Sequence, residues 1–560
     1  MNLSFAEATA RERLAQLLDA DSFYEILGPS ERVVSPHLAL LGLPAAFDDG
    51  VVIGEGLLNH KAVLIAAQEG EFMGGGVGEV HGAKLVGLLQ RALRVKPAAV
   101  LVLAESGGVR LHEANAGLIA VSEVMRALLA VRAAGIPVLM LIGGSNGCFG
   151  GMGLIARCAD TVIMSDVGRL AMSGPEVIES ANGVEEFDSR DRALVWRTTG
   201  GKHRYLMGDC DVLLEDDLAA FRAAAIATLH RSLPLNLATM EAEHELLTAR
   251  LNDYSDCQDA LDIWQRLGIV NPASVTDLEA NALPPLKASA ILPSVIRTSE
   301  VAISATLELQ KNQPLKTLLA ALFGEAHGIT VAGDLISGTG IMAPHETLAN
   351  PLEAQPSTTP ATVIGTTHHA AIGVELALAQ AQQVLQTVRH HPKRAIVLLI
   401  DTQGQRLRHR DELLGINRYM AHMGCCLELA RQQGHRIIAL VYDQALSGGF
   451  ITSGLMADAC YALPQAEIRV MRLPAMARVT KIDEARLTEL SKSNPVFAPG
   501  VENFVAMGGI QSLWRDDLQN CLRQALAEAT SPDDRAQLGA ARGGRALAAG
   551  VAQRIQNLSL

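Results

Sequence analysis

The chain has 560 residues, a formal net charge of −13, and a composition that is 49% hydrophobic but only 4% aromatic. This length exceeds one ordinary domain, so we expect two. The excess of acidic residues and the lack of a basic run argue against nucleic acid as the main ligand. Apolar residues occur in short runs, none near the roughly 20 residues that span a bilayer, so no membrane association is expected.

The N-terminal segment predicts a helix rather than a secretion signal. Ser4 and Glu7 have the spacing of a capping box, and charged residues follow at positions 11 to 13. We therefore expect a cytoplasmic protein. The eight cysteines include no C-x-x-C spacing, which disfavours a zinc ribbon or a disulfide framework and predicts buried free thiols.

A strand-loop-helix unit is predicted from residue 98 onward. An apolar strand at 98–104 leads into a loop with Gly107-Gly108, and a helix-period segment at 113–134 ends before a glycine. A second strand at 136–142 leads to Gly150-Gly151, a short helix and a strand near 161–164. This order predicts a parallel sheet with right-handed crossovers.

The second half repeats this unit. A strand at 395–400 leads to a loop ending at Gly404, a helix is predicted at 412–433, and a strand at 437–442 runs into Ser447-Gly448-Gly449. Ala-Asp follows the Gly-Gly pair at the same spacing in both halves, at 159–160 and 457–458. Two matching units in one chain predict duplicated α/β domains.

We assign the domains to residues 1–285 and 286–560. Prolines and small polar residues interrupt the helical periodicity in 276–293, where the boundary is expected. A second irregular stretch, 343–360, carries four prolines and predicts a loop within the second half.

The glycine loops follow strands of a parallel sheet, where ligands of α/β proteins gather. Glycine lets backbone N–H groups approach a ligand closely, and two converging N–H groups make an oxyanion hole. The alternative is that these glycines only permit tight turns. Nucleotide binding is disfavoured because no P-loop or G-x-G-x-x-G follows the first strand of either unit, although Gly74-Gly75-Gly76-x-Gly78 superficially resembles such a loop.

Other catalytic signatures are weak. The chain has no G-x-S-x-G elbow, and Cys148 has no base at a fixed spacing, which favours a buried or turn cysteine over a nucleophile. The pairs His368-His369 and His390-His391 point to different faces and predict surface or core histidines rather than a metal site.

The first half resembles the beta-type domain of the carboxyltransferase family, which comprises acyl-coenzyme A carboxylases and related decarboxylases. The resemblance rests on ARERL at 10–14, FMGG at 72–75, VHGAK at 80–84, SGGVRLHEA at 106–114 and SGPEVIE at 173–179. The second half is similar to alpha- or gamma-type partners through 400–404 and 447–449. The combination is most similar to beta and gamma subunits of biotin-independent malonate decarboxylase fused end to end.

This resemblance implies an α/β fold of two crotonase-like (ClpP/crotonase) β-β-α superhelix domains, and a thioester-decarboxylating enzyme. Two departures favour biotin independence within the family. Gln403-Gly404-Gln405-Arg406-Leu407-Arg408 replaces the proline- and glycine-rich loop of biotin-using relatives, and the zinc ribbon of the bacterial acetyl-coenzyme A carboxylase beta subunit is missing. The chain also lacks the Met-Lys-Met biotin attachment motif, which a separate carrier chain could supply. We expect a malonyl thioester to lose CO2 through an enolate that the backbone oxyanion holes stabilise.

The catalytic groups that we predict lie in the glycine loops and next to them. They are Gly107, Gly108, Gly150, Gly151, Gly404, Gly448, Gly449 and His112, with Glu105 and Glu113 as further candidate acids. Substrate contacts are predicted at Arg110, Gly74, Gly75, Ser173, Gly174 and Ser447. No metal ligand is predicted. A surface ion pair is the alternative for Arg110, and a solvated helix start is the alternative for Glu113.

The resemblance implies partners as well. The malonyl group would arrive on a phosphopantetheine-type arm, derived from dephospho-coenzyme A, of an acyl-carrier subunit that an alpha-type transferase subunit charges. No covalently bound cofactor and no biotin are expected. Lys84, Arg91, Arg94 and Lys96 could meet an acidic carrier, or simply form a solvated helix face. The rival functions are a biotin-dependent carboxyltransferase and a non-catalytic scaffold.

Overall fold

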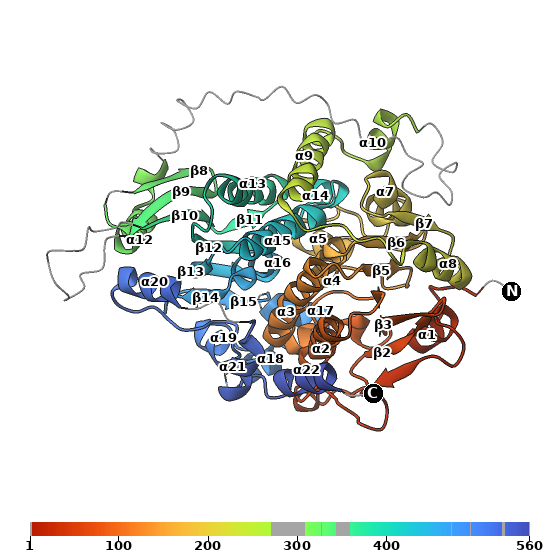
Figure 1. The fold of residues 1–560 in the computed structure, drawn as a ribbon. Helices are drawn as coiled ribbons and strands as arrows, with labels where there is room; N and C mark the ends of the chain where they lie inside the picture. The colour runs from red at the N-terminus through yellow and green to blue at the C-terminus, as the bar shows by residue number, and fades with distance from the viewer. Residues whose placement is uncertain are drawn as a thin grey trace.

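Two β-sheets, one in each half of the chain, organise the protein (Figure 1). The computed structural model describes residues 3–269, 308–325, 327–342, 359–471, 473–492, 494–528 and 532–558. The domain boundary expected at 276–293 and nearly all of the loop expected at 343–360 lie outside these residues.

The first sheet has seven strands that follow one another in chain order. They are β1 (Tyr24–Ile26), β2 (Val51–Leu58), β3 (Lys61–Gln68), β4 (Ala99–Leu103), β5 (Val138–Ile142), β6 (Thr161–Ser165) and β7 (Val212–Leu214). Pairing is antiparallel from β1 to β3 and parallel from β3 to β7. Every residue of β4, β5 and β6 is buried, as expected for parallel strands covered on both faces.

The second sheet repeats this plan. In the order β14-β13-β12-β10-β9-β8 it joins β8 (Gly328–Ala332), β9 (Leu335–Met342), β10 (Thr359–Thr366), β12 (Ile396–Gln405), β13 (Ile437–Leu446) and β14 (Ala459–Ala462). The antiparallel pair β9–β10 corresponds to β2–β3, and the parallel strands β10, β12, β13 and β14 correspond to β3 through β6. Short strands β11 (Ala370–Ile372) and β15 (Glu467–Arg469) pair in parallel with the C-terminal ends of β12 and β13, respectively.

The helices of the first half alternate with its strands. They are α1 (Ala10–Leu17), η1 (Leu38–Leu41), η2 (Met73–Gly75), α2 (Glu79–Val95), η3 (Leu111–Glu113), α3 (Ala114–Ala133), α4 (Gly150–Cys158), α5 (Pro175–Asn182), α6 (Arg192–Thr199), α7 (Gly201–Leu206), α8 (Leu218–Thr228), α9 (Leu237–Tyr254) and α10 (Ala260–Arg266).

The second half has α12 (Gln313–Phe323), α13 (Val374–His390), α14 (His409–Leu413), α15 (Ile416–Gln432), α16 (Ser447–Thr452) and η6 (Gly454–Met456). After its sheet come α17 (Leu473–Thr480), α18 (Glu484–Ser491), α19 (Val501–Ala506), α20 (Leu518–Ala527), α21 (Arg535–Ala541) and α22 (Ala548–Asn557). Helices α2 and α13, which follow equivalent strands, have the same length of 17 residues.

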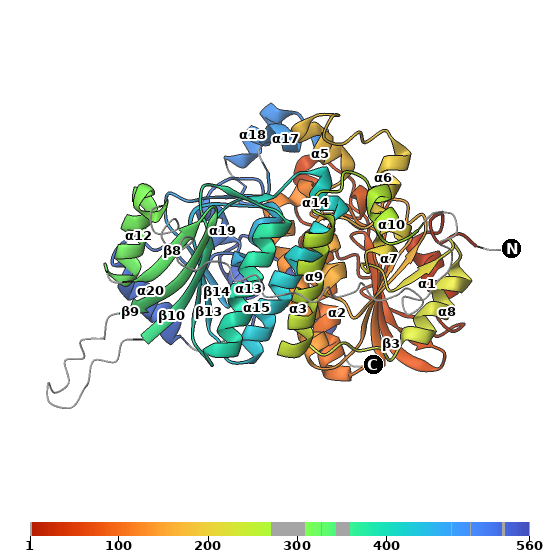
Figure 2. The same ribbon diagram turned by 90° about the horizontal axis from the view of Figure 1, so that it is seen from above.

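The helices form the contact between the halves. Figure 2 shows α3, α9, α13 and α15 between the two sheets. One hydrophobic core runs through this layer and includes residues of both halves, such as Met125 and Met420. Separate smaller cores cover the outer face of each sheet, beneath α1 and α8 in the first half and beneath α12 and α20 in the second. The halves therefore share their largest apolar core.

The predicted repeat and α/β fold class are confirmed. The strands at 98–104, 136–142 and 161–164 appear as β4, β5 and β6, and their counterparts appear as β12, β13 and β14. Neighbouring strands are also neighbours in the chain order, so the chain winds in one direction through each half, as a β-β-α superhelix does. The helix expected at 412–433 is interrupted at Gly415, whose φ of +79° suits glycine.

Two details differ from the expectations. The first helix begins at Ala10, and its capping box uses Thr9 and Glu12. At the predicted position the Glu7 N–H donates to the Ser4 hydroxyl oxygen at 3.0 Å, while the Ser4 hydroxyl donates to Asp216, but no helix begins there. The C-terminal helix α22 returns to the first half, where the Leu558 carbonyl accepts hydrogen bonds from Arg91 and Arg94. Residues assigned to the second domain thus complete the packing of the first.

One helical stretch among the described residues, Leu111–Ala133, is long and apolar enough to cross a membrane, although no membrane span was expected. Within the fold, 89% of its apolar window is buried, as in a core helix. It combines η3 and α3 and lies between the sheets (Figure 2). The cytoplasmic location stays a prediction.

Candidate active site at the converging glycine loops

Three glycine loops meet at the carboxyl ends of β3, β4 and β5. The Gly107 N–H donates to the Gly74 carbonyl at 2.8 Å. A Cβ on Gly75 would lie 1.8 Å from the Glu105 carbonyl oxygen, and a Cβ on Gly108 would lie 3.0 Å from the Gly150 Cα. Only glycine permits these approaches, and Gly108 also has a φ of +104°.

The backbone N–H groups of these loops differ in availability. The Gly107 and Gly150 amides are occupied by the carbonyls of Gly74 and Met172, each at 2.8 Å. The Gly108 amide donates to the Ser106 hydroxyl at 3.1 Å, within its own loop. The Gly151 amide has no acceptor in the part of the chain that the structure describes. Gly108 and Gly151 are therefore the donors best placed to bind an anion.

The position of Gly151 adds positive potential. It is the second residue of α4, where the backbone N–H groups of the first turn point out of the helix. A Cβ on Gly108 would lie 3.1 Å from the Gly151 nitrogen, so the two donors belong to one small site. This is the arrangement that an oxyanion hole requires.

The second half reproduces the first part of this geometry. Gly404 has a φ of +100°, and its amide donates to the Thr402 hydroxyl at 3.0 Å, as Gly108 does to Ser106. A Cβ on Gly404 would lie 3.2 Å from the Ser447 Cβ. Gly404 is thus the structural counterpart of Gly108.

The second glycine pair is shifted by one residue relative to the sequence repeat. Ser447 has a φ of +47° and begins α16, as Gly150 with a φ of +56° begins α4. The counterpart of Gly151 is therefore Gly448, not Gly449. The Gly448 amide donates to the Gln405 side-chain carbonyl at 3.2 Å, so that donor is occupied.

The two loop systems meet at the segment Met172-Ser173. The Met172 carbonyl holds the Gly150 amide, and a Cβ on Gly448 would lie 2.4 Å from the Met172 Cε. The Gln405 side-chain amide lies 3.5 Å from the Ser173 hydroxyl. Groups of both halves thus border the same segment.

Glu412 fixes this segment from the second half. Its buried carboxylate accepts the backbone N–H groups of Met172 at 3.0 Å and Ser173 at 2.6 Å. Burial raises the pKa of Glu412 to about 7, although these two hydrogen bonds favour the ionised form. Sequence analysis missed Glu412 because its partners lie more than 200 residues away. Gln405 could have been identified as a candidate site residue from the sequence, because it belongs to the loop that departs from the family pattern.

Arg110, predicted to contact substrate or to form a surface ion pair, is enclosed in the protein instead. Its guanidinium binds Asp49 at 2.9 Å and Glu113 at 2.7 Å, with no exposed side-chain surface on any of the three groups. Burial raises the pKa of Asp49 to about 6 despite the attraction of Arg110. The arginine therefore stabilises the loop from inside rather than facing the site.

The candidate acids have little freedom. Glu105 is buried against Arg13, and Glu113 lies in the Arg110 cluster rather than at a solvated helix start. His112 is half-buried and bonds the main chain of Thr480, and burial lowers its pKa. Of Glu105, Glu113 and His112, the described structure leaves His112 outside an ion pair, and its lowered pKa favours the neutral form.

The other predicted contacts fall in two groups. Gly74 and Gly75 border Gly107, whereas Gly174 caps α5 next to Ser173. The basic cluster on α2 divides into two parts: Lys84 and Arg91 are buried, whereas Arg94 and Lys96 are exposed, as in a solvated face. Lys84 donates to the Asp48 carbonyl, and Arg91 and Arg94 donate to the Leu558 carbonyl. An acidic carrier therefore cannot use Lys84 or Arg91.

The remaining predictions concern Cys148 and the histidine pair that contains His369. Cys148 is buried, as predicted, and burial raises the pKa of its thiol. His369, Asp401 and Asp443 place potential ligand atoms within 4.8 Å of one another, and His369 Nδ1 lies 2.7 Å from Asp401 Oδ1. A His–Asp hydrogen bond accounts for this contact, and the absence of a metal site stays a prediction.

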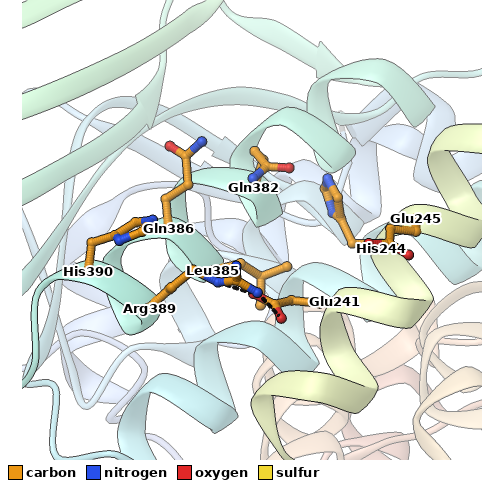
Figure 3. Close-up of a pocket in the computed structure, with 8 residues that line it drawn as sticks. All are labelled: Glu241, His244, Glu245, Gln382, Leu385, Gln386, Arg389 and His390. Carbon is orange, nitrogen blue, oxygen red and sulfur yellow. Dashed lines mark hydrogen bonds and ion pairs between the residues drawn. The ribbon is translucent and has the colours of Figure 1, made fainter. Parts of the chain in front are cut away.

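His390 lies in a surface pocket of about 260 Å³ between α9 and α13. Figure 3 shows its lining, including the ion pair between Glu241 and Arg389. None of the residues predicted for catalysis or substrate binding lines it. This pocket is therefore separate from the glycine loops.

Comparison with protein families matches residues 3–251 to the carboxyl transferase domain and residues 367–559 to the malonate decarboxylase gamma subunit. Among curated proteins, the chain is 42% identical over 295 residues to the malonyl-S-ACP:biotin-protein carboxyltransferase MADC of Malonomonas rubra, which covers 49% of this chain and 92% of the relative. It is 35% identical over 196 residues to MADD of the same organism, covering 31% and 67% respectively.

A crystal structure of a Pseudomonas malonate decarboxylase hetero-tetramer in complex with malonate is 40% identical, covers 47% of this chain and 97% of that chain, and has a TM-score of 0.44. The relatives MADC and MADD are both matched over two thirds or more of their own length, by sequence alone. The family predicted from the motifs is thereby confirmed: the chain belongs to the carboxyl transferase family, as a beta-type domain and a gamma-type domain joined in one polypeptide.

Proposed function

We propose that this chain is the decarboxylating unit of a malonate decarboxylase and converts a malonyl thioester to an acetyl thioester and CO2. The observation that carries the proposal is the convergence of Gly108 and Gly151 at the end of the parallel sheet. The sequence similarity to malonyl-S-ACP carboxyltransferases supports the substrate class.

In the proposed reaction the bond between the α carbon and the carboxylate breaks, and CO2 leaves. The electron pair of that bond moves onto the thioester oxygen and forms an enolate. The Gly108 and Gly151 N–H groups would donate to this oxygen, and the positive end of α4 would add to the stabilisation. To reach the enolate, the Gly108 amide exchanges its hydrogen bond to the Ser106 hydroxyl.

The enolate then takes a proton at the α carbon to give the acetyl group. Glu105 and Glu113 are held in buried ion pairs, which leaves them poorly suited to donate it. We propose that ordered water supplies the proton, with neutral His112 as the side chain able to orient it. A general base is not needed, because decarboxylation itself generates the carbanion.

The second glycine loop would have a different task. Gln405 occupies the Gly448 amide, so the second half offers no equally free pair of donors for an enolate. We propose that Gly404, Ser447, Gly448 and Gly449 border the side of the site from which CO2 leaves. Residues 1–285 would then form the thioester domain and residues 286–560 the domain that faces the departing carboxylate.

The substrate and its partners are part of the same proposal. The malonyl group would arrive on the phosphopantetheine-type arm of an acyl-carrier subunit, charged by a separate alpha-type transferase subunit, within a multi-subunit cytoplasmic assembly. Ser173, Gly174, Gly74 and Gly75 border the loops and would contact this arm. No biotin is required in this scheme.

A second candidate function is carboxyl transfer to biotin. The names of MADC and MADD state transfer from malonyl-S-ACP to a biotin protein, and this specific similarity favours the alternative. The two functions share the enolate and differ in the fate of the carboxyl group. The loop with Gln405 favours direct release, because its side chain fills the donor position of the second half.

Carbon dioxide release by the purified chain separates these functions. Malonyl-pantetheine or malonyl-coenzyme A would be supplied with and without avidin, and acetyl thioester would be quantified. Release that avidin does not affect supports direct decarboxylation. No release, together with carboxyl transfer to free biotin, supports the alternative. A scaffold predicts neither reaction by the purified chain.

A further inference from the structure

A cavity of about 540 Å³ lies among helices of both halves, away from the glycine loops. Its walls come from α2 and α3 of the first half, α15 of the second, and the C-terminal helices α21 and α22, which Figure 1 shows side by side with α2 and α3. This volume is within the usual range of small-molecule sites, about 300 to 1,000 Å³.

About half of the wall residues are apolar, and most of these are alanines. Ala83 and Val86 of α2, Ala127 of α3, and Ala549 and Ala552 of α22 line the cavity, with glutamine side chains at other positions. An apolar wall gives ordered water few hydrogen-bond partners. It suits the hydrocarbon part of a ligand.

Charged groups line one side, and among the described residues all but one of them have a partner of opposite charge of their own. Glu123 binds Arg545 through two hydrogen bonds of 2.8 and 2.6 Å. Asp533 binds Arg535, with one contact at 2.7 Å. The lining acids thus already have partners whose charges cancel theirs.

The same holds for the charges that α15 contributes. Glu428 pairs with Arg431, which also binds Asp458 at 2.7 Å, and Arg436 lies 4.0 Å from that aspartate. The pKa of Arg431 is raised, because Glu428 and Asp458 together outweigh the effect of burial. The two carboxylates of this set are therefore balanced by its two arginines.

Arg126 is the cation in excess among the described residues, because it shares Asp533 with Arg535. Only 9% of its surface is exposed, and within the described part of the chain its guanidinium makes one hydrogen bond, from Nη1 to the Ala457 carbonyl at 3.0 Å. Its Nε lies 3.6 Å from Asp533, which Arg535 already binds more closely. Burial lowers the pKa of Arg126 to about 10, and the attraction of Asp533 offsets only part of this effect.

We propose that this cavity binds one small amphiphilic monoanion, an aliphatic carboxylate whose head pairs with Arg126 and whose chain lies against Ala127 and Ala549. One uncompensated cation calls for one negative charge, and a carboxylate matches the hydrogen-bonding edge of a guanidinium. The apolar part of the wall favours an occupant with a hydrocarbon chain over a bare ion.

The site has a route to the glycine loops. Helix α3 carries Arg126 and also Val121, whose Cγ1 would lie 2.4 Å from a Cβ on Gly151. These two residues are about 7.5 Å apart along the helix axis at 1.5 Å per residue. A ligand that shifts α3 would therefore act on the Gly151 end of the proposed oxyanion hole.

Equilibrium dialysis of labelled octanoate against the full chain tests the proposal. We expect saturable binding of one octanoate per chain, at least tenfold tighter than octanol. Arg126→Met should weaken octanoate at least tenfold, and Ala549→Phe, which fills the cavity, should abolish binding. Ala546→Phe is the matched control, because Ala546 is exposed and outside the cavity lining; its binding should equal that of the parent chain.

Three results would overturn the proposal. They are the absence of octanoate binding by the parent chain, binding that Ala549→Phe leaves unchanged, and displacement of octanoate by millimolar inorganic phosphate. If Arg126→Met does not fold, the comparison of Ala549→Phe with Ala546→Phe decides, since both keep the buried charges. The readout is binding and does not depend on the decarboxylase reaction.

Discussion

Gly108 and Gly151 approach each other so closely that a Cβ on Gly108 would lie 3.1 Å from the amide nitrogen of Gly151. The two residues follow different strands, β4 and β5, and their contact creates the proposed anion site. Its counterpart in the second half, formed by Gly404 and Gly448, has the same backbone arrangement. There, however, the Gln405 side chain accepts the hydrogen bond of the Gly448 amide.

This contrast predicts unequal effects of one substitution. Gly108→Ala and Gly404→Ala impose similar strain, since the φ angles are +104° and +100°. Alanine keeps the backbone N–H, but a Cβ at position 108 would lie 3.0 Å from the Gly150 Cα and 3.1 Å from the Gly151 nitrogen, so it would push the two donors apart. Disabling an oxyanion-hole donor costs about two to three orders of magnitude in kcat. We expect such a loss for Gly108→Ala and a loss below about fivefold for Gly404→Ala, because Gly404 is not proposed to bind the enolate. Steady-state kinetics measure both, with circular dichroism to confirm folding.

Equal losses in the two variants would contradict an enolate site confined to the first half. If both variants keep the parent kcat, neither loop stabilises the transition state, and the catalytic groups lie elsewhere in the chain. The matched backbone angles make strain an insufficient reason for a difference.

Gln405 gives a second prediction. Gln405→Ala removes the acceptor of the buried Gly448 amide, and leaving a buried donor unsatisfied costs about 1 to 3 kcal/mol. We expect urea unfolding to show a loss in this range while kcat stays within about threefold, since Gln405 lies outside the proposed enolate site. A hundredfold fall in kcat with unchanged stability would instead place Gln405 among the groups that contact the substrate.

Glu412 predicts a dependence of stability on pH. Its folded pKa of about 7 exceeds the ordinary value of 4.5, so the folded chain holds this proton more tightly than the unfolded chain. The stabilising effect is complete below pH 4.5 and is lost as the pH rises to 7. The size is roughly 3 kcal/mol at 1.4 kcal/mol per pKa unit.

Glu412→Gln should remove this decline. Urea unfolding at pH 5 and pH 7.5 gives the change in unfolding free energy for each protein, and other titrating groups cancel in the difference between them. We expect the parent chain to lose more stability over this interval than the variant. Parallel pH profiles would show that Glu412 has an ordinary pKa in the folded chain.

Replacement of Arg110 tests whether this arginine stabilises the protein from inside or contacts the substrate. Arg110→Met leaves Asp49 and Glu113 as unpaired buried carboxyl groups, and breaking such a buried pair costs about 3 to 5 kcal/mol. The matched control is Arg266→Met, which removes an exposed pair with Asp256 and should cost no more than about 1 kcal/mol. Thermal and urea unfolding measure both. A stable Arg110→Met chain with a raised KM would restore the predicted substrate contact.

Local patterns predicted the repeated strands and loops because buried parallel strands appear as apolar runs and helices end at glycine. The pairing of Gly107-Gly108 with Gly150-Gly151 followed from their positions after neighbouring strands. The same reasoning aligned Gly448 with Gly150, since Asp160 and Asp458 accept equivalent backbone amides at 2.8 Å. The one-residue shift at Ser447 arises from backbone angles that composition does not reveal.

Long-range partners were not predictable from one sequence. Arg110 meets Asp49 across 61 residues, and Glu412 meets Met172 across 240. No local periodicity links such residues, so a charged side chain next to a glycine loop gave the same signal whether it faced the site or the interior. The return of α22 to the first half has the same origin, because its partner surface on α2 lies at the other end of the chain.

The most direct test of the central claim is CO2 release from malonyl-pantetheine by the purified chain, measured with and without avidin and with the acyl-carrier partner added. We predict CO2 release that avidin does not affect, with one acetyl thioester formed for each CO2, and a fall of about two to three orders of magnitude in Gly108→Ala. No CO2 release under any of these conditions, accompanied by carboxyl transfer to free biotin, would contradict direct decarboxylation and assign the chain to biotin-dependent carboxyl transfer.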